Sequence, residues 1–439
     1  MGDPLYAGDI GLAVVLITLL KVVITFALLL VSVMMMVWFE RKIIADMQHR
    51  IGPNRAGPWG ILQTLADGIK LFFKEDLLPE RAERRVFHIA PLLALIPAFL
   101  AFSIIPLGGD FNGGDGTISM FGHRTFVQLA DPPIGVLFVL AMSGLGVYGI
   151  MLAGWSSGSK YPLLGSVRAS AQIVSYEAAL GLSLAAVLLV TGAVSTHDIV
   201  ASQAGSGVRT VTNWVVFTVG FVPAITFLIA AIAELNRPPF DLVEAEQELV
   251  GGFNTEYSSI RFALFYLTEF MNTITMSALF VVLFFGGPAG PLHFNFLPNL
   301  WPFVNFLAKL MVFLYFFVWL RGTLPRFRYD QLMDLGWKRL IPLALGWLLL
   351  LGAIRLAQDY DWKGGEVAAL IVICGLLLVG FALLQLSLRA ARRTREDQID
   401  EAIDPYGVPL RAGAAGPDGP DGTPDTAGSH EVRPVERVF

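Results

Sequence analysis

Nine long apolar runs constrain the fold of this chain more than any other feature of its sequence. Each run holds roughly 20 mostly apolar residues, which is the length that an α-helix needs to cross a bilayer. Only 15% of the 439 residues are charged, and long uncharged stretches separate the charges. We therefore expect an all-α, polytopic membrane protein of about nine transmembrane helices. The expected helices lie near residues 10–38, 88–107, 133–154, 172–191, 213–233, 259–285, 301–320, 340–357 and 367–388.

The overall composition excludes several classes of protein. A hydrophobic content of 55% exceeds what one soluble core can bury, which excludes an ordinary cytoplasmic enzyme and a disordered chain. A net charge of −5 and the lack of a broad basic face argue against a nucleic-acid binder. The only cysteine, Cys374, cannot by itself hold an iron–sulfur cluster, which needs four ligands. We therefore expect neither a metal nor a flavin on this chain.

One short motif resembles a nucleotide-binding loop. The segment 144–149 matches G-x-G-x-x-G, but it lies inside an apolar run rather than between a strand and a soluble helix. Small residues in such a run let two helices pack closely. We interpret the motif as a helix-packing feature.

The distribution of Lys and Arg predicts the orientation, because cytoplasmic loops carry an excess of both residues. With the N-terminus outside, the inward loops and the C-terminal exit hold 22 basic residues, against four on the outward side. We therefore expect a periplasmic N-terminus and a cytoplasmic C-terminus. Residues 1–393 form the expected transmembrane domain, and residues 394–439, rich in Gly, Pro and Asp, form a disordered cytoplasmic tail.

Four ionisable residues lie inside the apolar runs: Lys21, Glu177, Glu269 and Lys309. A charge at the centre of a bilayer costs roughly 2.5–3.5 kcal/mol on insertion scales. The lysines are long enough to reach the interface with their ammonium groups, so a functional role is not required for them. Glu177 is expected about five residues into its helix, whereas Glu269, about ten residues in, cannot easily reach water. A buried glutamate can carry protons near neutral pH, which favours a proton relay.

The inward segment 234–257 carries six acidic residues and a single base, Arg237. A charged loop is usually a solvated surface, but apolar residues such as Phe240 and Phe253 are interleaved with these acids. A loop this apolar should pack against the protein and take its carboxylates with it. Because clustered carboxylates can hold shared protons, we interpret this loop as functional.

Residues 59–74 predict an amphipathic surface helix in the first cytoplasmic loop. Leu65, Ile69 and Phe72 recur at helical spacing, while Asp67 and Lys70 fall on another side. A helix of this kind lies on the membrane surface. It suits an anchor, a docking surface for a partner, or the lip of a cavity open to lipid.

Four inward loops carry the most specific signal in the sequence. They read W-F-E-R-K-I-I-A-D-M-Q-H-R-I-G-P-N-R-A-G-P-W-G running on to A-D-G-I-K-L-F-F-K-E-D, then G-W-S-S-G-S-K-Y-P-L-L-G-S-V-R-A-S-A-Q-I-V-S-Y-E, then the acidic loop ending E-Y-S-S-I-R-F-A-L-F, then L-R-G-T-L-P-R-F-R-Y-D-Q-L-M-D-L-G-W-K. In this order they resemble the H-subunit family of bacterial respiratory complex I, which is similar to mitochondrial NADH dehydrogenase subunit 1. The resemblance covers about residues 10–357, so the ninth helix and the tail lie outside the family core.

The resemblance implies a subunit of proton-translocating NADH:quinone oxidoreductase, in the bacterial plasma membrane, that carries no redox centre. It implies a quinone chamber built with the quinone-reducing and terminal iron–sulfur subunits of the soluble arm, and contact with the antiporter-like membrane subunits. The family's quinone chamber maps onto Glu40, Arg41, Gln48, Arg50, Asp67, Lys70, Arg168, Phe240, Asp241 and Arg261. The family's proton relay maps onto Glu177, Glu234, Glu244, Glu246, Glu248, Glu256 and Glu269. The basic fourth loop, with Arg321, Arg326 and Arg328, can pair with the acidic loop or with the soluble arm.

Two alternatives and the identity of the quinone are left open. A membrane subunit of an energy-converting hydrogenase shares the superfamily, but the full-length third and fourth loops favour complex I. A stand-alone proton-coupled secondary transporter would suit intramembrane Glu and Lys, but the paired repeats typical of transporters are not evident. The Ala, Gly, Arg and Pro bias indicates a GC-rich bacterial genome, so menaquinone is preferred over ubiquinone as substrate.

Overall fold

The computed structural model of the chain describes residues 3–7, 11–111, 114–205, 209–218, 220–241, 250–291, 300–359 and 375. By their contacts, residues Met1–Leu370 form one compact unit, which contains every described helix and strand. The second unit, Ile371–Phe439, contributes only Gly375 to the described residues. The expected ninth helix (367–388), except Gly375, and the expected tail (394–439) lie outside the described residues.

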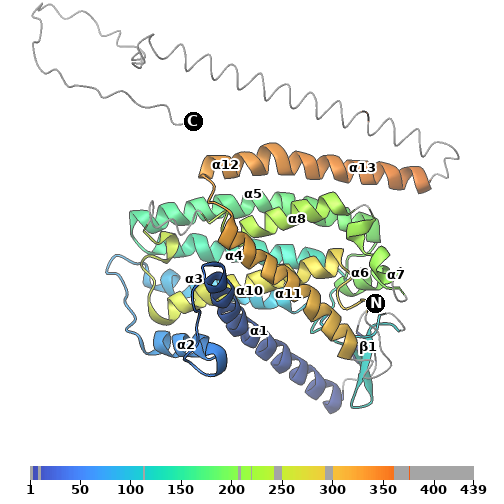
Figure 1. Cartoon of the computed structure of the whole chain (residues 1–439), viewed down its shortest axis with the longest axis horizontal. Coiled ribbons are helices and arrows are strands. Elements are labelled where there is room, and N and C mark those ends of the chain that lie inside the picture. Colours follow the sequence, from blue (N-terminus) through green and yellow to red (C-terminus); the bar gives the residue numbers. More distant parts are fainter. Residues whose placement is uncertain are drawn as a thin grey trace, which may run out of the picture. The chain divides into compact units, whose positions relative to one another are not determined.

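The first unit is a bundle of helices with one small hairpin (Figure 1). The helices are α1 (Leu12–Met47), α2 (Gln63–Phe73), α3 (Arg84–Phe102), α4 (Gly135–Ser156), α5 (Lys160–Thr191), α6 (Thr196–Gln203), α7 (Arg209–Thr212), α8 (Phe221–Glu234), α10 (Ser259–Phe284), α11 (Leu300–Thr323), α12 (Tyr329–Leu335) and α13 (Ile341–Asp359). A π-helical turn, Gly336–Leu340, joins α12 to α13. Strands β1 (Thr117–Met120) and β2 (His123–Phe126) pair antiparallel, with Thr117 opposite Phe126.

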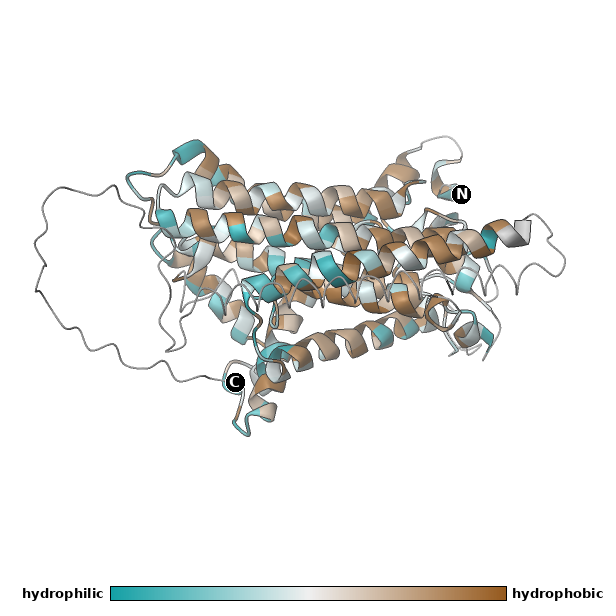
Figure 2. Ribbon diagram, turned by 90° about the horizontal axis from the view of Figure 1, so that it is seen from above, coloured by the Kyte–Doolittle hydropathy of each residue, from teal (hydrophilic) through white to brown (hydrophobic). Residues whose placement is uncertain are grey.

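Seven of the described helices are long and apolar enough to cross a membrane. They are α1, α3, α4, α5, α10, α11 and the continuous segment Tyr329–Leu356. Figure 2 shows these helices as mostly brown, apolar ribbons. The all-α, polytopic fold predicted from the apolar runs is therefore confirmed, whereas the total of nine spans stays a prediction.

Helix α10 forms the centre of the bundle. Of its most apolar window, 83% is buried inside the chain, against 22% for α1. It contacts α1, α2, α3, α8 and α11. Nearly every residue from Phe270 to Phe284 is buried, so other parts of the chain surround this half of α10.

Two expected boundaries were wrong. The fifth span, expected at 213–233, begins only at Phe221, because the chain breaks at Gly220, where a Cβ would lie 2.5 Å from the Val215 carbonyl oxygen. The fourth span, expected from residue 172, begins at Lys160, with Pro162 in the first turn, where proline is tolerated. Hydropathy misses this start because residues 160–171 are partly polar although helical. Glu177 is therefore the eighteenth residue of α5, well inside the helix rather than near its start.

The bundle has two polar ends. We call one the Glu40 end, where the last turns of α1 and α11 meet the first turns of α3 and α10 (Figure 1). We call the other the hairpin end, where β1 and β2 lie. Gly192, in the left-handed region with φ +69°, ends α5 at the hairpin end, as glycine commonly does after a helix.

Candidate functional site

Four charged side chains from four parts of the chain meet near the Glu40 end. Glu40 lies on α1, Arg237 follows α8, Glu269 lies on α10 and Arg321 lies in the last turn of α11. Arg237 Nη1 donates to Glu40 Oε2 at 2.8 Å, and Arg237 Nε lies 3.0 Å from Glu269 Oε1. Arg321 contacts the other carboxylate oxygen of Glu40. We call these four residues the charge cluster.

The centre of the charge cluster is withdrawn from solvent. The side chains of Glu40 and Arg237 are each 5% exposed, whereas that of Arg321 is 39% exposed. The Arg237 guanidinium also lies over the Phe270 ring, 4.3 Å from its centroid. A buried charge loses hydration, which an opposite charge and hydrogen bonds can offset. Here two acids balance the formal charge of two bases, although Arg237 Nη2 has no hydrogen-bond partner among the described residues.

The turn after α8 places Arg237 beneath α10. Asn236 has φ +51°, a left-handed conformation that Asn tolerates better than most residues, so the chain reverses directly after the helix. Phe240 then anchors the turn, because its buried ring stacks on Phe327 with centroids 5.5 Å apart. Gln172 of α5 donates to the backbone carbonyls of Ala233 and Phe240 and so holds both sides of the turn.

A cavity of about 100 Å³ lies beside the charge cluster, and this volume has room for several water molecules. Its lining is mostly apolar but includes Ser143, Glu234, Glu269 and Asn272. Ser143 Oγ donates to Glu234 Oε1, while Glu234 Oε2 is buried and has no hydrogen-bond partner among the described residues. Water in the cavity can therefore satisfy this carboxylate.

Helix α4 borders two glutamates of the predicted relay, Glu234 and Glu177. Ser143 contacts Glu234, and a Cβ on the next residue, Gly144, would lie 3.1 Å from Glu177 Oε1. Further along α4, a Cβ on Gly149 would lie 2.6 Å from the Ala94 backbone nitrogen of α3. Gly149 thus permits close packing of α4 on α3, in agreement with the interpretation made from the sequence, whereas a Cβ on Gly146 would meet no atom within 4 Å.

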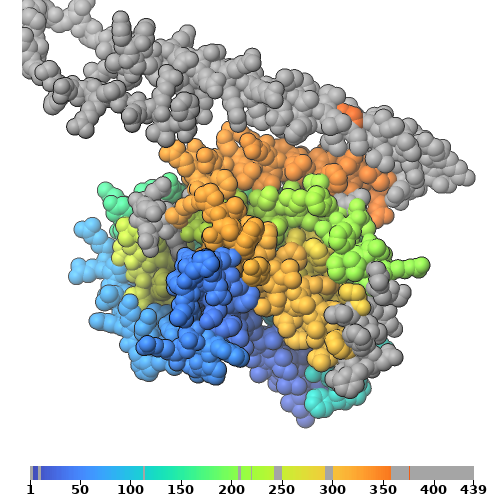
Figure 3. Space-filling view, viewed as in Figure 1, coloured from blue at the N-terminus to red at the C-terminus, as the bar shows by residue number. Residues whose placement is uncertain are grey.

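Among the predicted quinone residues of the first loop, Arg41 lies next to the charge cluster. Arg41, which follows Glu40, pairs with Asp67 of α2 at 2.5 Å, and Gln63 also donates to Asp67. Figure 3 shows α1, α2 and α11 on one face of the unit. Lys70 is exposed on α2. Beyond the end of α1, Arg50 Nε donates to Gln48 Oε1 at 2.7 Å, and both side chains are exposed.

The remaining predicted quinone residues divide between two places. Asp241 pairs with Arg326 at 3.2 Å, beside the stacked rings of Phe240 and Phe327. The Arg168 guanidinium lies 5.4 Å from the centroid of the Tyr329 ring. Arg261 lies elsewhere, at the start of α10, where it pairs with Asp76.

The fourth loop pairs with the acidic loop only in part. The prediction holds for Arg326, which binds both the side chain and the backbone of Asp241. Arg321 pairs instead with Glu40, because the last turn of α11 packs near the end of α1. Arg328 begins α12, where its backbone nitrogen donates to Gln331.

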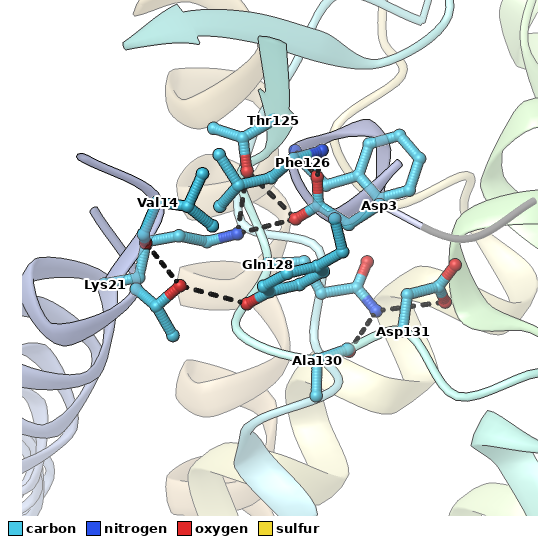
Figure 4. Close-up of polar contacts among 11 residues, drawn as sticks. Asp3, Val14, Lys21, Thr125, Phe126, Gln128, Ala130 and Asp131 are labelled. Atoms are coloured by element: carbon cyan, nitrogen blue, oxygen red, sulfur yellow. Dashed lines mark hydrogen bonds and ion pairs between the residues drawn. The ribbon is translucent and has the colours of Figure 1, made fainter. Parts of the chain in front are cut away.

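Both intramembrane lysines have polar partners within the fold. Lys21 is 7% exposed, and its ammonium group donates to Asp3 at 2.8 Å and to Thr125 at 2.9 Å (Figure 4). Lys309 donates to the backbone carbonyls of Phe285, Gly287 and Ala289, which follow the end of α10. Both lysines thus lie at the hairpin end, where they join neighbouring segments.

Asp131 is a second acidic residue near the Lys21–Asp3 ion pair, and it also forms hydrogen bonds within the fold (Figure 4). Asp131 accepts a hydrogen bond from Ser195 at 2.6 Å and lies near Gln128. Burial raises the pKa of the Asp131 carboxyl, although the hydrogen bond from Ser195 opposes the shift. The contact joins the loop before α4 to the start of α6.

Part of the predicted relay lies outside the described residues, namely Glu244, Glu246 and Glu248. Glu256 is described and half-buried. Among the residues that the structure describes, no group of three or more His, Cys, Asp and Glu side chains is placed to hold a metal ion. The ion pairs that join Arg237 to Glu40 and Glu269 were not foreseen, although a single base among six acids was a usable signal.

Comparisons with known proteins agree on one family. The sequence model of the NADH dehydrogenase family matches residues 20–352. The H subunit of the NADH-quinone oxidoreductase from Frankia alni is 49% identical over 392 residues, which cover 86% of this chain and 83% of the relative. The protein of the same name from Frankia casuarinae is 49% identical over 82% of this chain and 78% of its own length. That of Streptomyces avermitilis is 47% identical over 83% of this chain and 79% of its own length.

Proposed function

Because the chain belongs to the NADH dehydrogenase family, alongside the H subunits of NADH-quinone oxidoreductase, we propose that it forms the quinone chamber of that enzyme and couples quinone reduction to proton pumping. The chain is a multi-pass membrane protein and a subunit of the complex, so other complex I subunits are its partners. Quinone is the substrate of the complex, and menaquinone is the proposed form.

The charge cluster is the observation that carries this proposal. Glu40 belongs to the predicted quinone set, and its neighbour Arg41 pairs with Asp67 at the proposed mouth of the chamber. Glu269 belongs to the predicted proton relay and lines the cavity that Glu234 also lines. Arg237 contacts both Glu40 and Glu269, so one buried guanidinium connects the two sets. A change of charge near Glu40 is then felt electrostatically at Glu269, because buried charges are poorly screened.

The proposal extends to orientation and partners. The Glu40 end faces the cytoplasm, where the basic loops gather, and there it meets the quinone-reducing and terminal iron–sulfur subunits of the soluble arm. The antiporter-like subunits of the membrane arm are the partners within the bilayer. The N-terminus is periplasmic, and the C-terminus is cytoplasmic.

The chamber is tested by Asp67→Asn in the assembled complex. This change keeps the shape of Asp67 but removes the charge that holds Arg41, so NADH:quinone activity should fall while NADH:ferricyanide activity, which bypasses the quinone, persists. Asp46→Asn is the matched control, because Asp46 is exposed in the last turns of α1 and is in no described ion pair. Unchanged quinone activity in Asp67→Asn would contradict the role of α2 in the chamber.

The coupling role is tested by Glu234→Gln, which keeps size and hydrogen bonding but cannot release a proton. We expect protons pumped per NADH to fall in membrane vesicles, with complex content unchanged on native gels. Glu75→Gln, at an exposed position after α2, is the control. Wild-type stoichiometry in both Glu234→Gln and Glu177→Gln would limit this subunit to the wall of the chamber.

A further inference from the structure

The start of α10 provides hydrogen bonds to the C-terminal end of α2. The two contacts of Ser259 with this end join residues 188 and 185 positions apart in the sequence. The last carbonyl groups of any α-helix lack partners within the helix. Ser259 Oγ lies 3.0 Å from the Leu71 carbonyl oxygen and 2.8 Å from that of Lys74, and it donates to this pair. The preceding residue, Ser258, accepts a hydrogen bond from the Leu77 backbone nitrogen at 2.8 Å. Two consecutive serines therefore cap α2 and hold the segment that follows it.

Helix α2 depends strongly on such attachments. None of its residues is buried within the described part of the chain, and its apolar side chains, such as Phe72 and Phe73, are largely exposed. An 11-residue helix is only marginally stable by itself in water. Its other polar attachment is the pair between Arg41 and Asp67. The two attachments hold the middle and the last turn of α2 against different helices, α1 and α10.

The anchor at the start of α10 is itself fixed in the bundle. The Tyr257 ring stacks on that of Phe87 in α3, with centroids 4.0 Å apart and planes 4° from parallel. Tyr257 also donates to the Phe87 carbonyl, and burial raises its pKa to about 12, so its hydroxyl keeps the proton it donates. The Arg261 guanidinium also lies over the Phe87 ring, 5.0 Å from its centroid, and pairs with Asp76. The serines thus present their hydroxyls from a rigid support.

Ser259 has a backbone conformation that helix formation alone does not explain. Ser259 is 3% exposed and has φ +55°, in the left-handed region that residues other than glycine rarely adopt. Such a conformation is unfavourable by itself and persists only where surrounding contacts impose it. At Ser259 the hydrogen bonds to the Leu71 and Lys74 carbonyls are the contacts that impose this conformation.

We propose that Ser258 and Ser259 are positioning residues for the quinone chamber, which hold α2 so that Asp67 and Lys70 stay at its mouth. This inference rests on the proposed function, since it gives α2 a role in quinone access. It adds a dependence of that role on α10, the helix that also carries Glu269. The serines touch neither substrate nor reacting atoms and act only through the placement of α2.

The test compares serine variants of the assembled complex by two independent measurements. Hydrogen exchange of the α2 amides reports whether the helix is held, and the KM for a short-tailed soluble quinone reports whether the mouth is formed. In Ser259→Ala we expect exchange and KM each to rise about two- to tenfold, as for the loss of one ordinary hydrogen bond, with little change in kcat. Ser258→Ala, which removes a single acceptor at a half-buried residue, should give a smaller change and serves if Ser259→Ala fails to assemble.

Two further variants separate the hydroxyl from the backbone. Ser259→Asn tolerates the left-handed region and can donate from its amide, so it should restore much of both values. Ser259→Gly relieves the backbone but removes the hydroxyl, so it should behave like Ser259→Ala. Ser277→Ala is the matched control, because this buried serine of α10 donates to the Thr273 carbonyl within its own helix.

The outcomes are distinct. Unchanged α2 exchange in both alanine variants overturns the inference, whatever the quinone kinetics. Wild-type behaviour of Ser259→Gly overturns it as well, since the backbone would then matter and not the hydroxyl. Faster exchange with an unchanged KM would mean that the serines stabilise α2 but that α2 does not control quinone access, which would refute the proposal.

Discussion

Neutralising Glu40 is the most severe test of the charge cluster. Glu40→Gln leaves the guanidinium of Arg237 buried with only Glu269 beside it, and it removes the described partner of Arg321. The formal charge of the cluster changes from zero to +1. A glutamine oxygen can accept a hydrogen bond from Arg237, but it supplies no counter-charge.

The magnitude follows from burial. Both side chains of the Glu40–Arg237 pair are 5% exposed, and breaking such a pair by removing one partner costs about 3–5 kcal/mol. Arg321 is 39% exposed and can turn to water, so its pair contributes about 0–1 kcal/mol. The loss in Glu40→Gln is thus a large share of the roughly 5–15 kcal/mol that stabilises a typical domain. Arg321→Gln should be nearly neutral.

The assay heats the purified complex and follows release of this subunit on native gels. We expect the order of midpoint temperatures to be wild type, then Arg321→Gln, then the double variant Glu40→Gln with Arg237→Gln, then Glu40→Gln. The double variant should have a higher midpoint than Glu40→Gln because it returns the formal charge of the cluster to zero, and Glu269, 29% exposed, can be hydrated in the absence of Arg237.

Strict additivity would refute this reasoning. If the double variant lost as much stability as the sum of its two single variants, Glu40 and Arg237 would not be coupled, and the buried pair would not hold α1 to the turn after α8. A Glu40→Gln complex as stable as wild type would likewise contradict the burial argument.

Three further predictions concern other parts of the molecule. For orientation, we use a Cys374→Ser background. Cysteine at the exposed position Ser119 of β1 should label from outside the cell, and cysteine at the exposed Asn54 only after the membrane is opened; reversed labelling would invert the proposed topology. At the hairpin end, Asp3→Asn should lower the thermal midpoint of subunit release, because it leaves Lys21 without a counter-charge. Adding Lys21→Met should recover part of this loss, and a further loss would exclude the Lys21–Asp3 pair as its cause. In the loop before α10, Tyr257→Phe should keep the stack on Phe87 but cost about 1 kcal/mol through its lost hydrogen bond, and a loss as large as that in Tyr257→Ala would mean that the ring contributes little.

The local sequence determined the fold class and the placement of most helices. A run of about 20 apolar residues has no stable alternative to a transmembrane helix, because the bilayer core offers its backbone no other hydrogen-bond partners. This holds whatever the run packs against, so α1, α4 and α11 were predictable from hydropathy. The loop motifs identified the family for a similar reason, since they are read along the chain and need no partner.

Only the tertiary structure decided which charges meet. Glu40 and Arg237 are 197 residues apart, and Arg321 is farther along the chain, so their pairing depends on how α1, α8 and α11 pack. The same holds for Ser259, whose hydroxyl reaches α2 across 188 residues to Leu71. It also holds for the depth of Glu177, because the polar start of α5 becomes helical where other segments support it. Hydropathy depends on the transfer free energy of each residue by itself. An ion pair depends on two distant side chains that packing brings together, and packing is a property of the whole bundle.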